Sequence, residues 1–182
     1  MQKDLIQMLK SGKIGIYPTD TLYGLVGSAL SKKTVTRIYA AKKRTPVKAC
    51  IILISSIKTL ALFDISLTSF QKKQLQLYWP GKVTVILSLN KEGISRYKYL
   101  HRGTNTLAFR LPKQESLRKL LKKTGPLIAP SANSEGMPPA SNIKQAQEYF
   151  GDNVDFYVSG RVSKKASKII SLTDDKVTII RK

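Results

Sequence analysis

Short apolar runs that alternate with amphipathic segments constrain the fold of this chain more than any other feature. Strands are predicted at residues 14–17, 50–55, 83–89, 106–111, 126–129, 155–159 and 177–181. Helices are predicted at residues 2–11, 31–42, 57–63, 66–78, 115–123 and 142–150. The run CIILIS at 50–55 is continuously apolar and rich in β-branched side chains, which is typical of a central strand. This alternation predicts a layered α/β domain with a mixed or mostly parallel sheet and flanking helices.

Three predicted helix ends carry residues that commonly cap helices. Gly12 follows the first helix, Ser31 precedes the second, and Asn142 precedes the last. Within the second helix, Val35, Ile38 and Tyr39 recur at the spacing of one helical face. The helix boundaries are therefore set by local chemistry as well as by periodicity.

Length and composition indicate one globular domain over residues 1–182. The chain has 182 residues, of which 42% are hydrophobic and 24% charged. No apolar run approaches the roughly 20 residues of a membrane-spanning helix, and the start MQKDLIQMLKSG does not resemble a signal peptide. The single cysteine, Cys50, lies in an apolar run and is interpreted as a reduced, buried thiol. We expect a cytoplasmic protein that does not associate with a membrane.

The formal net charge of +21 is unusual for a chain of this size. Its 32 Lys and Arg residues oppose only 11 Asp and Glu, and the basic clusters are spread along the chain rather than gathered in a tail. Two readings stay open: an anionic macromolecular partner such as RNA, or a surface that is merely basic.

Several common kinds of site are excluded by the sequence. It contains neither GxGxxG nor GxxxxGK[ST], so neither a dinucleotide-binding fingerprint nor a P-loop is supported. One histidine and one cysteine cannot build a conventional zinc site. His101, in the stretch YLHRGTN, is interpreted as a surface loop residue rather than a catalytic base.

Polar segments follow three of the predicted strands, where α/β sheets commonly bind ligands. These segments are PTDTLYGL at 18–25, RLPK at 110–113 and PSAN at 130–133. Arg110 closes an apolar strand, so it is either a solvated strand end or a clamp for a carboxylate or phosphate. Ser131 and Asn133 flank Ala132 and would point to one side of an extended segment. They either hydrogen-bond one ligand or form a local Asx or Ser turn.

A basic cluster follows the second predicted helix in the stretch AAKKRTPVK. Lys42, Lys43, Arg44 and Lys48 could simply complement the dipole at the end of the helix. Alternatively, they could converge on a polyphosphate, with Arg44 offering a planar fork and Lys42 a point charge.

Taken together, five ordered motifs resemble the threonylcarbamoyl-AMP synthase family of the YrdC/TsaC type over nearly the whole chain. They are YPTDTLYGL, RIYAAKKRTPVKACIILI, YWPGKVTVIL, TLAFRLP and PSANSEGMPP. The chain departs from the family pattern at Thr45-Pro46, Leu53, Lys82, Glu135, Ser159–Arg161 and Lys168.

The resemblance implies a twisted α/β sheet around a basic concave cavity. It also implies an enzyme that makes threonylcarbamoyl-AMP and pyrophosphate from L-threonine, bicarbonate or CO2, and ATP. A separate transferase would then place the threonylcarbamoyl group on the tRNA adenosine next to the anticodon. A magnesium ion is expected to accompany ATP, held mostly by phosphate oxygens and water.

The resemblance also implies roles for individual residues. The family's catalytic tetrad falls on Lys42, Arg44, Ser131 and Asn133. The implied ATP contacts are Arg44, Lys48, Thr106, Ser131, Pro139 and Arg181. The implied threonine contacts are Thr21, Arg110, Ala129 through its backbone, and Ser167.

Two other functions stay open at this point. One is a non-catalytic RNA-binding or ribosome-assembly protein that uses the same basic cavity. The other is a carbamoyl-adenylate-forming module of the kind found inside larger hydrogenase-maturation proteins, which would use carbamoyl phosphate in place of threonine.

Overall fold

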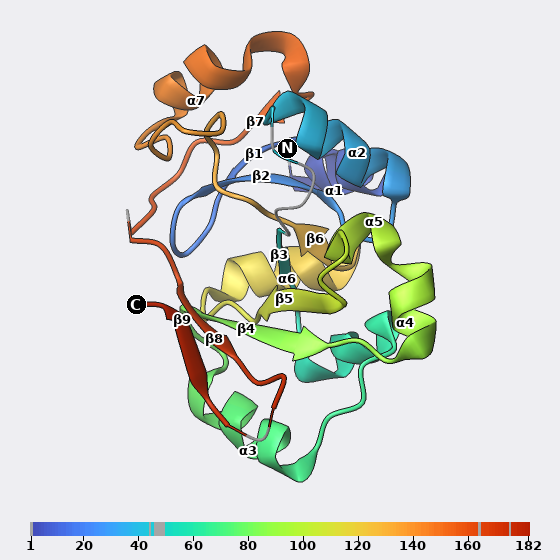
Figure 1. Ribbon diagram of the computed structural model, residues 1–182. Helices are drawn as coiled ribbons and strands as arrows, with labels where there is room; N and C mark the ends of the chain where they lie inside the picture. Colours follow the sequence, from blue (N-terminus) through green and yellow to red (C-terminus); the bar gives the residue numbers. More distant parts are fainter. Residues whose placement is uncertain (1, 44, 46–49, 164, 175) are drawn as a thin grey trace.

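A nine-stranded twisted sheet forms the framework of the described residues, which are 2–43, 45, 50–163, 165–174 and 176–182 of a computed structural model (Figure 1). Its strands are β1 (Gly15–Pro18), β2 (Tyr23–Ser28), β3 (Ile51–Leu53), β4 (Val83–Ser88), β5 (Thr106–Arg110), β6 (Leu127–Ile128), β7 (Phe156–Tyr157), β8 (Lys168–Ser171) and β9 (Thr178–Arg181). They are arranged in the order β7-β1-β2-β6-β3-β5-β4-β8-β9. The apolar run predicted as a central strand is therefore central.

The α-helices are α1 (Gln2–Lys10), α2 (Lys32–Ala41), α3 (Ser69–Tyr78), α4 (Lys91–Arg96), α5 (Lys98–His101), α6 (Glu115–Thr124) and α7 (Ile143–Phe150). Two 3₁₀ helices, η1 (Ile57–Phe63) and η2 (Gly151–Asn153), complete the described helical elements. Figure 1 shows α7 and α3 at opposite ends of the molecule.

The sheet is mixed, as one of the two sequence-based expectations had it. Parallel pairing joins β1 to β7, β3 to β5, and β4 to β8. Antiparallel pairing joins β1 to β2, β2 to β6, β3 to β6, β4 to β5, and β8 to β9. Antiparallel contacts thus outnumber parallel ones among the described strands, so the expectation of a mostly parallel sheet was wrong.

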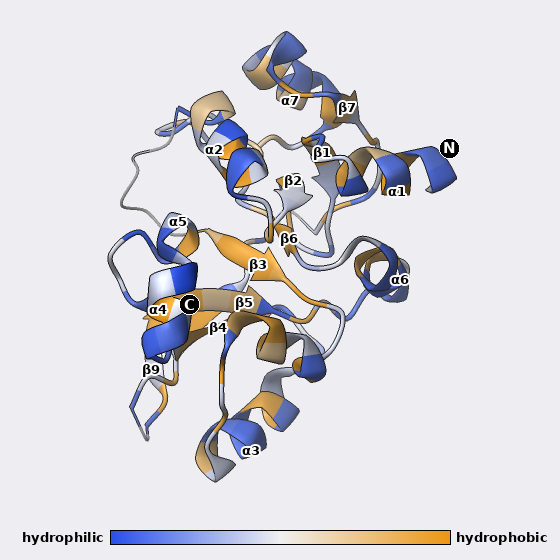
Figure 2. Cartoon of the chain, turned by 90° about the vertical axis from the view of Figure 1, so that its right-hand side faces the viewer, coloured by the Kyte–Doolittle hydropathy of each residue, from blue (hydrophilic) through white to orange (hydrophobic). Residues whose placement is uncertain are grey.

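Alternate strand residues belong to two hydrophobic clusters on opposite faces of the sheet, because successive side chains of a strand point to opposite sides. Ile52 and Ile128 belong to the larger cluster, together with side chains of α2, α5 and η1. Leu53 and Leu127 belong to the smaller cluster, formed mainly with α1 and α6. Figure 2 shows the apolar residues of β3 and β5 in the interior and hydrophilic residues on the helices around them.

The predicted helix caps are present. Ser31 Oγ accepts a hydrogen bond from Thr34 N at 3.2 Å, and Asn142 Oδ1 accepts one from Gln145 N at 3.0 Å. Gly12 adopts a positive φ of 84° just after α1, a conformation that costs glycine little.

The sequence did not reveal β2, β8, α4 or α5 as elements. The polar segment predicted at 18–25 is in fact the end of β1, a tight turn and the start of β2. Gly24 and Gly27 make the sequence of β2 look like a loop, yet Gly27 is required by packing. A Cβ at Gly27 would lie 2.6 Å from Thr34 Cγ2 on α2.

His101 is buried at 4% exposure, so its assignment to the surface was wrong. Its Nδ1 accepts a hydrogen bond from Gly103 N at 3.1 Å, and its Nε2 lies 2.9 Å from the carbonyl oxygen of Ile94. Because Nδ1 is an acceptor, Nε2 carries the proton and donates to that carbonyl. The histidine therefore ties α4 to the turn after α5.

Two further expectations concern the burial of Cys50 and helices that could span a membrane. Cys50 is buried, as predicted. Among the described residues, no helix is both long and apolar enough to cross a membrane.

Candidate functional site

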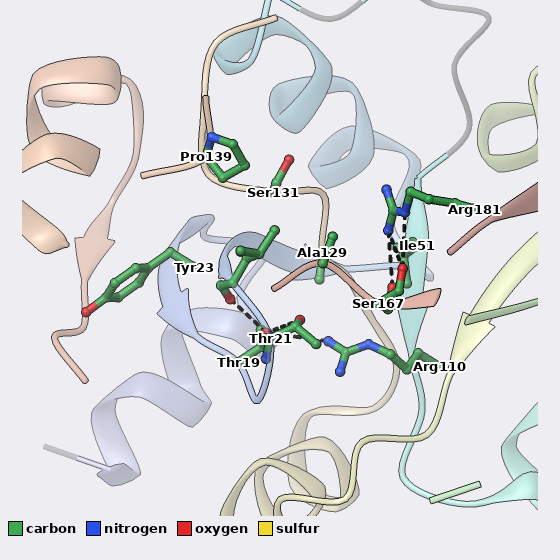
Figure 3. Close-up of a pocket in the computed structure, with 13 residues that line it drawn as sticks. Thr19, Thr21, Tyr23, Ile51, Arg110, Ala129, Ser131, Pro139, Ser167 and Arg181 are labelled. Atoms are coloured by element: carbon green, nitrogen blue, oxygen red, sulfur yellow. Dashed lines mark hydrogen bonds between the residues drawn. The ribbon is translucent and has the colours of Figure 1, made fainter. Parts of the chain in front are cut away.

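A cavity of about 150 Å³ opens where the β1–β2 turn, the end of β5, the segment after β6 and the start of β8 meet (Figure 3). Thirteen residues line it: Thr19, Thr21, Leu22, Tyr23, Gly24, Ile51, Arg110, Ala129, Ser131, Pro139, Ala166, Ser167 and Arg181. Hydroxyl and guanidinium groups are set among apolar side chains, a lining typical of sites for small polar ligands.

The turn between β1 and β2 forms one wall through a network of hydroxyl groups. Thr19 Oγ1 donates to the carbonyl of Leu22 at 2.7 Å and accepts from Thr21 N at 3.2 Å. Because that proton is used, Thr21 Oγ1, at 3.0 Å, is the donor to Thr19 Oγ1. The turn is thus held by its own side chains, which explains how a strand can reverse here without glycine.

Arg110 extends from the end of β5 toward this turn. Its guanidinium forms an ion pair with Asp20, and its Nη2 lies 3.4 Å from Thr19 Oγ1. Both partners of the pair are shielded from water, with side-chain exposures of 4% for Arg110 and 9% for Asp20. Arg110 Nε is buried and has no hydrogen-bond partner among the described residues. Arg110 is therefore not a solvated strand end, and its Nε donor is unused within this part of the chain.

Ser167 and Arg181 form the opposite wall. Arg181 donates from Nη2 and Nε to the carbonyl of Ser167 at 2.7 and 3.1 Å, and Nη2 also lies 3.3 Å from Ser167 Oγ. Burial lowers the pKa of the Arg181 guanidinium, although it remains a cation at neutral pH. Behind Ser167 lies Thr84 of β4, whose hydroxyl is 2.8 Å from Ser167 Oγ.

The segment after β6 contributes Ser131 to the cavity, while the Asn133 side chain turns away into its own loop. Asn133 Oδ1 accepts from Ser131 Oγ at 2.7 Å and from Lys42 Nζ at 3.0 Å. Asn133 Nδ2 donates to the carbonyls of Ser134 and Met137, both at 2.8 Å. The amide of Asn133 thus has all its principal partners inside the protein and serves as a turn-forming group.

Lys42, the C-cap residue of α2, is buried at 1% exposure and points into this loop. Its Nζ donates to the carbonyls of Ser131 and Asn133 at 2.7 and 2.6 Å, in addition to Asn133 Oδ1. Three members of the expected tetrad, Lys42, Ser131 and Asn133, are therefore joined in one network.

Comparisons with known proteins identify the family of the chain. A model of the Sua5/YciO/YrdC family, described as "Telomere recombination", matches residues 7–182. The chain belongs to this family.

Two curated relatives are named threonylcarbamoyl-AMP synthase. The chain is 30% identical over 176 residues to threonylcarbamoyl-AMP synthase of Pyrococcus abyssi, and the match covers 95% of this chain and 51% of that protein. It is also 30% identical over 151 residues to threonylcarbamoyl-AMP synthase of Idiomarina loihiensis, which covers 81% of this chain and 79% of that protein.

Among solved structures, P. abyssi Sua5 complexed with L-threonine superimposes with a TM-score of 0.89 at 27% identity. The match covers 99% of this chain and 53% of that one. The chain therefore spans about half the length of the P. abyssi protein.

The remaining family-derived residues are distributed as follows. Thr21, Arg110, Ala129, Ser131, Pro139, Ser167 and Arg181 line the cavity. Thr106 begins β5, with its Oγ1 donating to Thr104 Oγ1 at 3.2 Å, and does not line the cavity. Arg44 and Lys48 lie outside the described residues.

Two departures from the family pattern have a structural explanation. Leu53, where many relatives have histidine, is fully buried among side chains of α1 and α6. Glu135 accepts hydrogen bonds from the backbone N and the Oγ1 of Thr45, at 2.5 and 2.9 Å. It thereby connects the loop after β6 to the segment after α2, at the place where the family usually has serine.

Sequence reasoning missed four residues that build the site: Thr19, Asp20, Tyr23 and Thr84. The first three lie in the motif YPTDTLYGL and the fourth in YWPGKVTVIL, so the signal was present in the motifs. Tyr23 shows why its role was hidden. Its hydroxyl donates to the carbonyl of Gly160 at 2.5 Å, a contact between residues 137 positions apart.

Proposed function

We propose that the chain is an L-threonylcarbamoyladenylate synthase, a nucleotidyltransferase. It would use L-threonine, bicarbonate or CO2, and ATP to form threonylcarbamoyl-AMP and pyrophosphate, for modification of the tRNA adenosine next to the anticodon. A downstream transferase would receive the product, and cytoplasm is the expected location.

One observation supports this function above the others: residues assigned to the two substrates share one cavity. Thr21, Arg110 and Ser167 belong to the threonine side, whereas Ser131, Pro139 and Arg181 belong to the ATP side. They come from segments that are far apart in the sequence. An RNA-binding surface alone would not require this convergence.

The chemistry needs positioned groups more than a nucleophile from the protein. The threonine amine adds to CO2 and loses a proton, which gives a carbamate. A carbamate oxygen then attacks the α-phosphorus of ATP, and the bond to the β-phosphate oxygen breaks to release pyrophosphate. Holding carbamate and phosphate in line supplies much of the rate enhancement in such a reaction.

Arg110 lines the cavity and would supply the positive charge that meets the threonine carboxylate. The Asp20 carboxylate and Thr19 hold the guanidinium in place, so no rearrangement is needed when ligand arrives. The cavity of about 150 Å³ fits a small amino acid. ATP would extend from it toward Ser131 and Pro139.

The triphosphate would meet the basic segment after α2. We assign Arg44 and Lys48 to its phosphates and Thr106 to the nucleotide. Lys42 acts differently from a phosphate contact in this arrangement, because its ammonium group holds the backbone of Ser131 and Asn133. It would contribute to catalysis by fixing the wall against which the phosphates bind.

A magnesium ion would enter with ATP. Among the described residues no cluster of three or more His, Cys, Asp or Glu side chains could hold a metal, and Asp20 is already paired with Arg110. The side chains therefore fit an ion carried by phosphate oxygens and water, which would neutralise charge on the triphosphate.

The test is incubation with ATP, L-threonine and bicarbonate, followed by measurement of pyrophosphate and of the adenylate by mass spectrometry. Pyrophosphate release should require threonine and bicarbonate together. Arg110→Lys is the informative variant, because it keeps the charge but loses the planar fork, and it should raise the threonine KM. Equal pyrophosphate release with carbamoyl phosphate and no threonine would instead support the carbamoyl-adenylate function.

The charge of +21 favours a second candidate function, binding of RNA. If about six phosphates are contacted, tRNA affinity should fall by on the order of 10³ between low and physiological salt. A protein that binds tRNA in this way without pyrophosphate release would be a non-catalytic RNA-binding factor. Absence of salt-dependent binding would rule out that candidate.

A further inference from the structure

We propose that Thr84, which lies outside the cavity, positions Ser167 so that its hydroxyl proton points at the substrate. This inference rests on the proposed function for the identity of the ligand. Thr84 lies in the motif YWPGKVTVIL, which contributes none of the residues assigned above to ATP or threonine.

Thr84 is fully buried, at 0% exposure, in strand β4. Within the described part of the chain, its hydroxyl has one hydrogen-bond partner, Ser167 Oγ at 2.8 Å. A buried hydroxyl whose proton has no acceptor costs free energy. If Ser167 donated to Thr84, the Thr84 proton would have no acceptor among these residues. The favourable arrangement is therefore that Thr84 donates and Ser167 accepts.

Arg181 fixes the remaining bonding capacity of Ser167. A serine hydroxyl has one proton to donate and two lone pairs that accept. One lone pair receives Thr84, and the other faces Arg181 Nη2 at 3.3 Å. The proton of Ser167 is then left for the cavity that the residue lines.

The backbone of Ser167 is held in the same arrangement. Arg181 donates two hydrogen bonds to its carbonyl, at 2.7 and 3.1 Å. Thr84 itself is fixed by strand pairing, since β4 and β8 run parallel with Thr84 beside Ile169. Ser167 is 3% exposed in this setting and cannot sample many rotamers.

A hydroxyl that can only donate selects an acceptor oxygen on the ligand. On the amino-acid side of the cavity, that oxygen belongs to L-threonine. Ser167 and Arg110 then both present donors to the substrate, and Thr84 acts as a positioning residue that contacts neither substrate. Its contribution is expected in threonine affinity and not in ATP affinity.

The experiment compares Thr84→Val, Thr84→Ser and Ser167→Ala with a matched control, Thr34→Val. Valine keeps the shape and the β-branching of threonine but removes the hydroxyl. Thr34 is also a buried threonine, at 1% exposure, whose hydroxyl hydrogen-bonds to Gly12 and Ser31 far from the cavity. Calorimetric titration measures L-threonine and ATP separately on each variant, and a thermal melt accompanies each titration.

Thr84→Val should raise the Kd for threonine about three- to tenfold, the effect of one neutral hydrogen bond, and leave the Kd for ATP unchanged. Thr84→Ser should restore threonine binding to near the wild-type value. In the double variant, Thr84→Val should add nothing to the loss caused by Ser167→Ala, because Thr84 acts through Ser167. Thr34→Val should change neither affinity.

Unchanged threonine affinity in Thr84→Val, equal weakening of both ligands, or additive losses in the double variant would each overturn the proposal. Failure of the wild type to bind threonine is a different result, since it overturns the proposed function together with the ligand assigned here. The melting temperatures of the same four-member cycle then still report whether Thr84 and Ser167 are coupled.

Discussion

Arg110 and Lys42 are both buried cations beside the candidate site, but their side chains serve different purposes. Arg110 pairs with the carboxylate of Asp20 and lines the cavity. Lys42 donates to two backbone carbonyls and an amide oxygen of the loop after β6, and it does not line the cavity. The first cation is placed where a ligand can meet its charge. The second holds the backbone of a loop in position.

The largest effect should come from removing the partner of Arg110. Asp20→Ala leaves the guanidinium buried and uncompensated, so the free energy of unfolding should fall by about 3–5 kcal/mol. Urea denaturation followed by circular dichroism measures it. The matched control is Glu115→Ala in the exposed Glu115–Lys119 pair, which should leave the unfolding midpoint nearly unchanged. Equal effects of the two substitutions would show that Arg110 is solvated.

Lys42→Met should lower the free energy of unfolding by about 3 kcal/mol, because three oxygens lose hydrogen bonds to a charged donor. Methionine can retain most of the apolar contacts of the lysine stem. The neighbouring Lys43 is exposed and provides the control, since Lys43→Met should be neutral. If Lys42→Met proves as stable as wild type while ATP affinity drops, Lys42 is a phosphate contact and the clamp interpretation is wrong.

Asn133→Ala tests the loop from its other side. The substitution removes acceptors for Lys42 and Ser131 and two donors to loop carbonyls, so we expect a loss of about 2 kcal/mol in stability. Asn142→Ala, which removes a helix cap elsewhere, is a reference for a loss of about 1 kcal/mol. A stable Asn133→Ala protein with weakened ATP binding would show instead that Asn133 is a ligand group.

Ser131→Ala should have the smallest effect on stability, below about 1 kcal/mol, because within the described residues its hydroxyl makes one hydrogen bond, to Asn133. Its effect should appear in ATP affinity, which we expect to fall about tenfold if the hydroxyl turns from Asn133 to donate to a phosphate. Calorimetric titration with ATP beside a thermal melt separates the two quantities. Wild-type ATP affinity in this variant would remove Ser131 from the nucleotide site.

Local signals in the sequence predicted the caps of α2 and α7 and the central position of β3, because each depends on residues close together in the chain. The strand β2 was hidden by Gly24 and Gly27, and the role of Gly27 depends on α2 packing against the sheet. The same limit applies to the site. Nothing near Asn133 in the sequence reveals that Lys42, 91 residues earlier, occupies its amide oxygen.

The family motifs predicted more of the site than hydrophobic periodicity and helix caps did. They pointed to Thr21, Arg110 and Ser131, which line one cavity, without any knowledge of the strand order. They did not distinguish groups that face the cavity from groups that hold those groups in place. Asp20, Thr84 and Lys42 belong to the second kind, and that distinction requires the direction of each side chain.

The cavity draws its lining from Thr19 near one end of the sequence to Arg181 near the other. During synthesis, β1 and β2 can pair early because they are adjacent in sequence, but the wall that contains Ser167 is held by Arg181. A ribosome-bound chain that has not yet released residue 181 would therefore have a partly formed sheet without a complete site. Ligand binding would therefore begin only after residue 181 has emerged and Arg181 has bonded to Ser167.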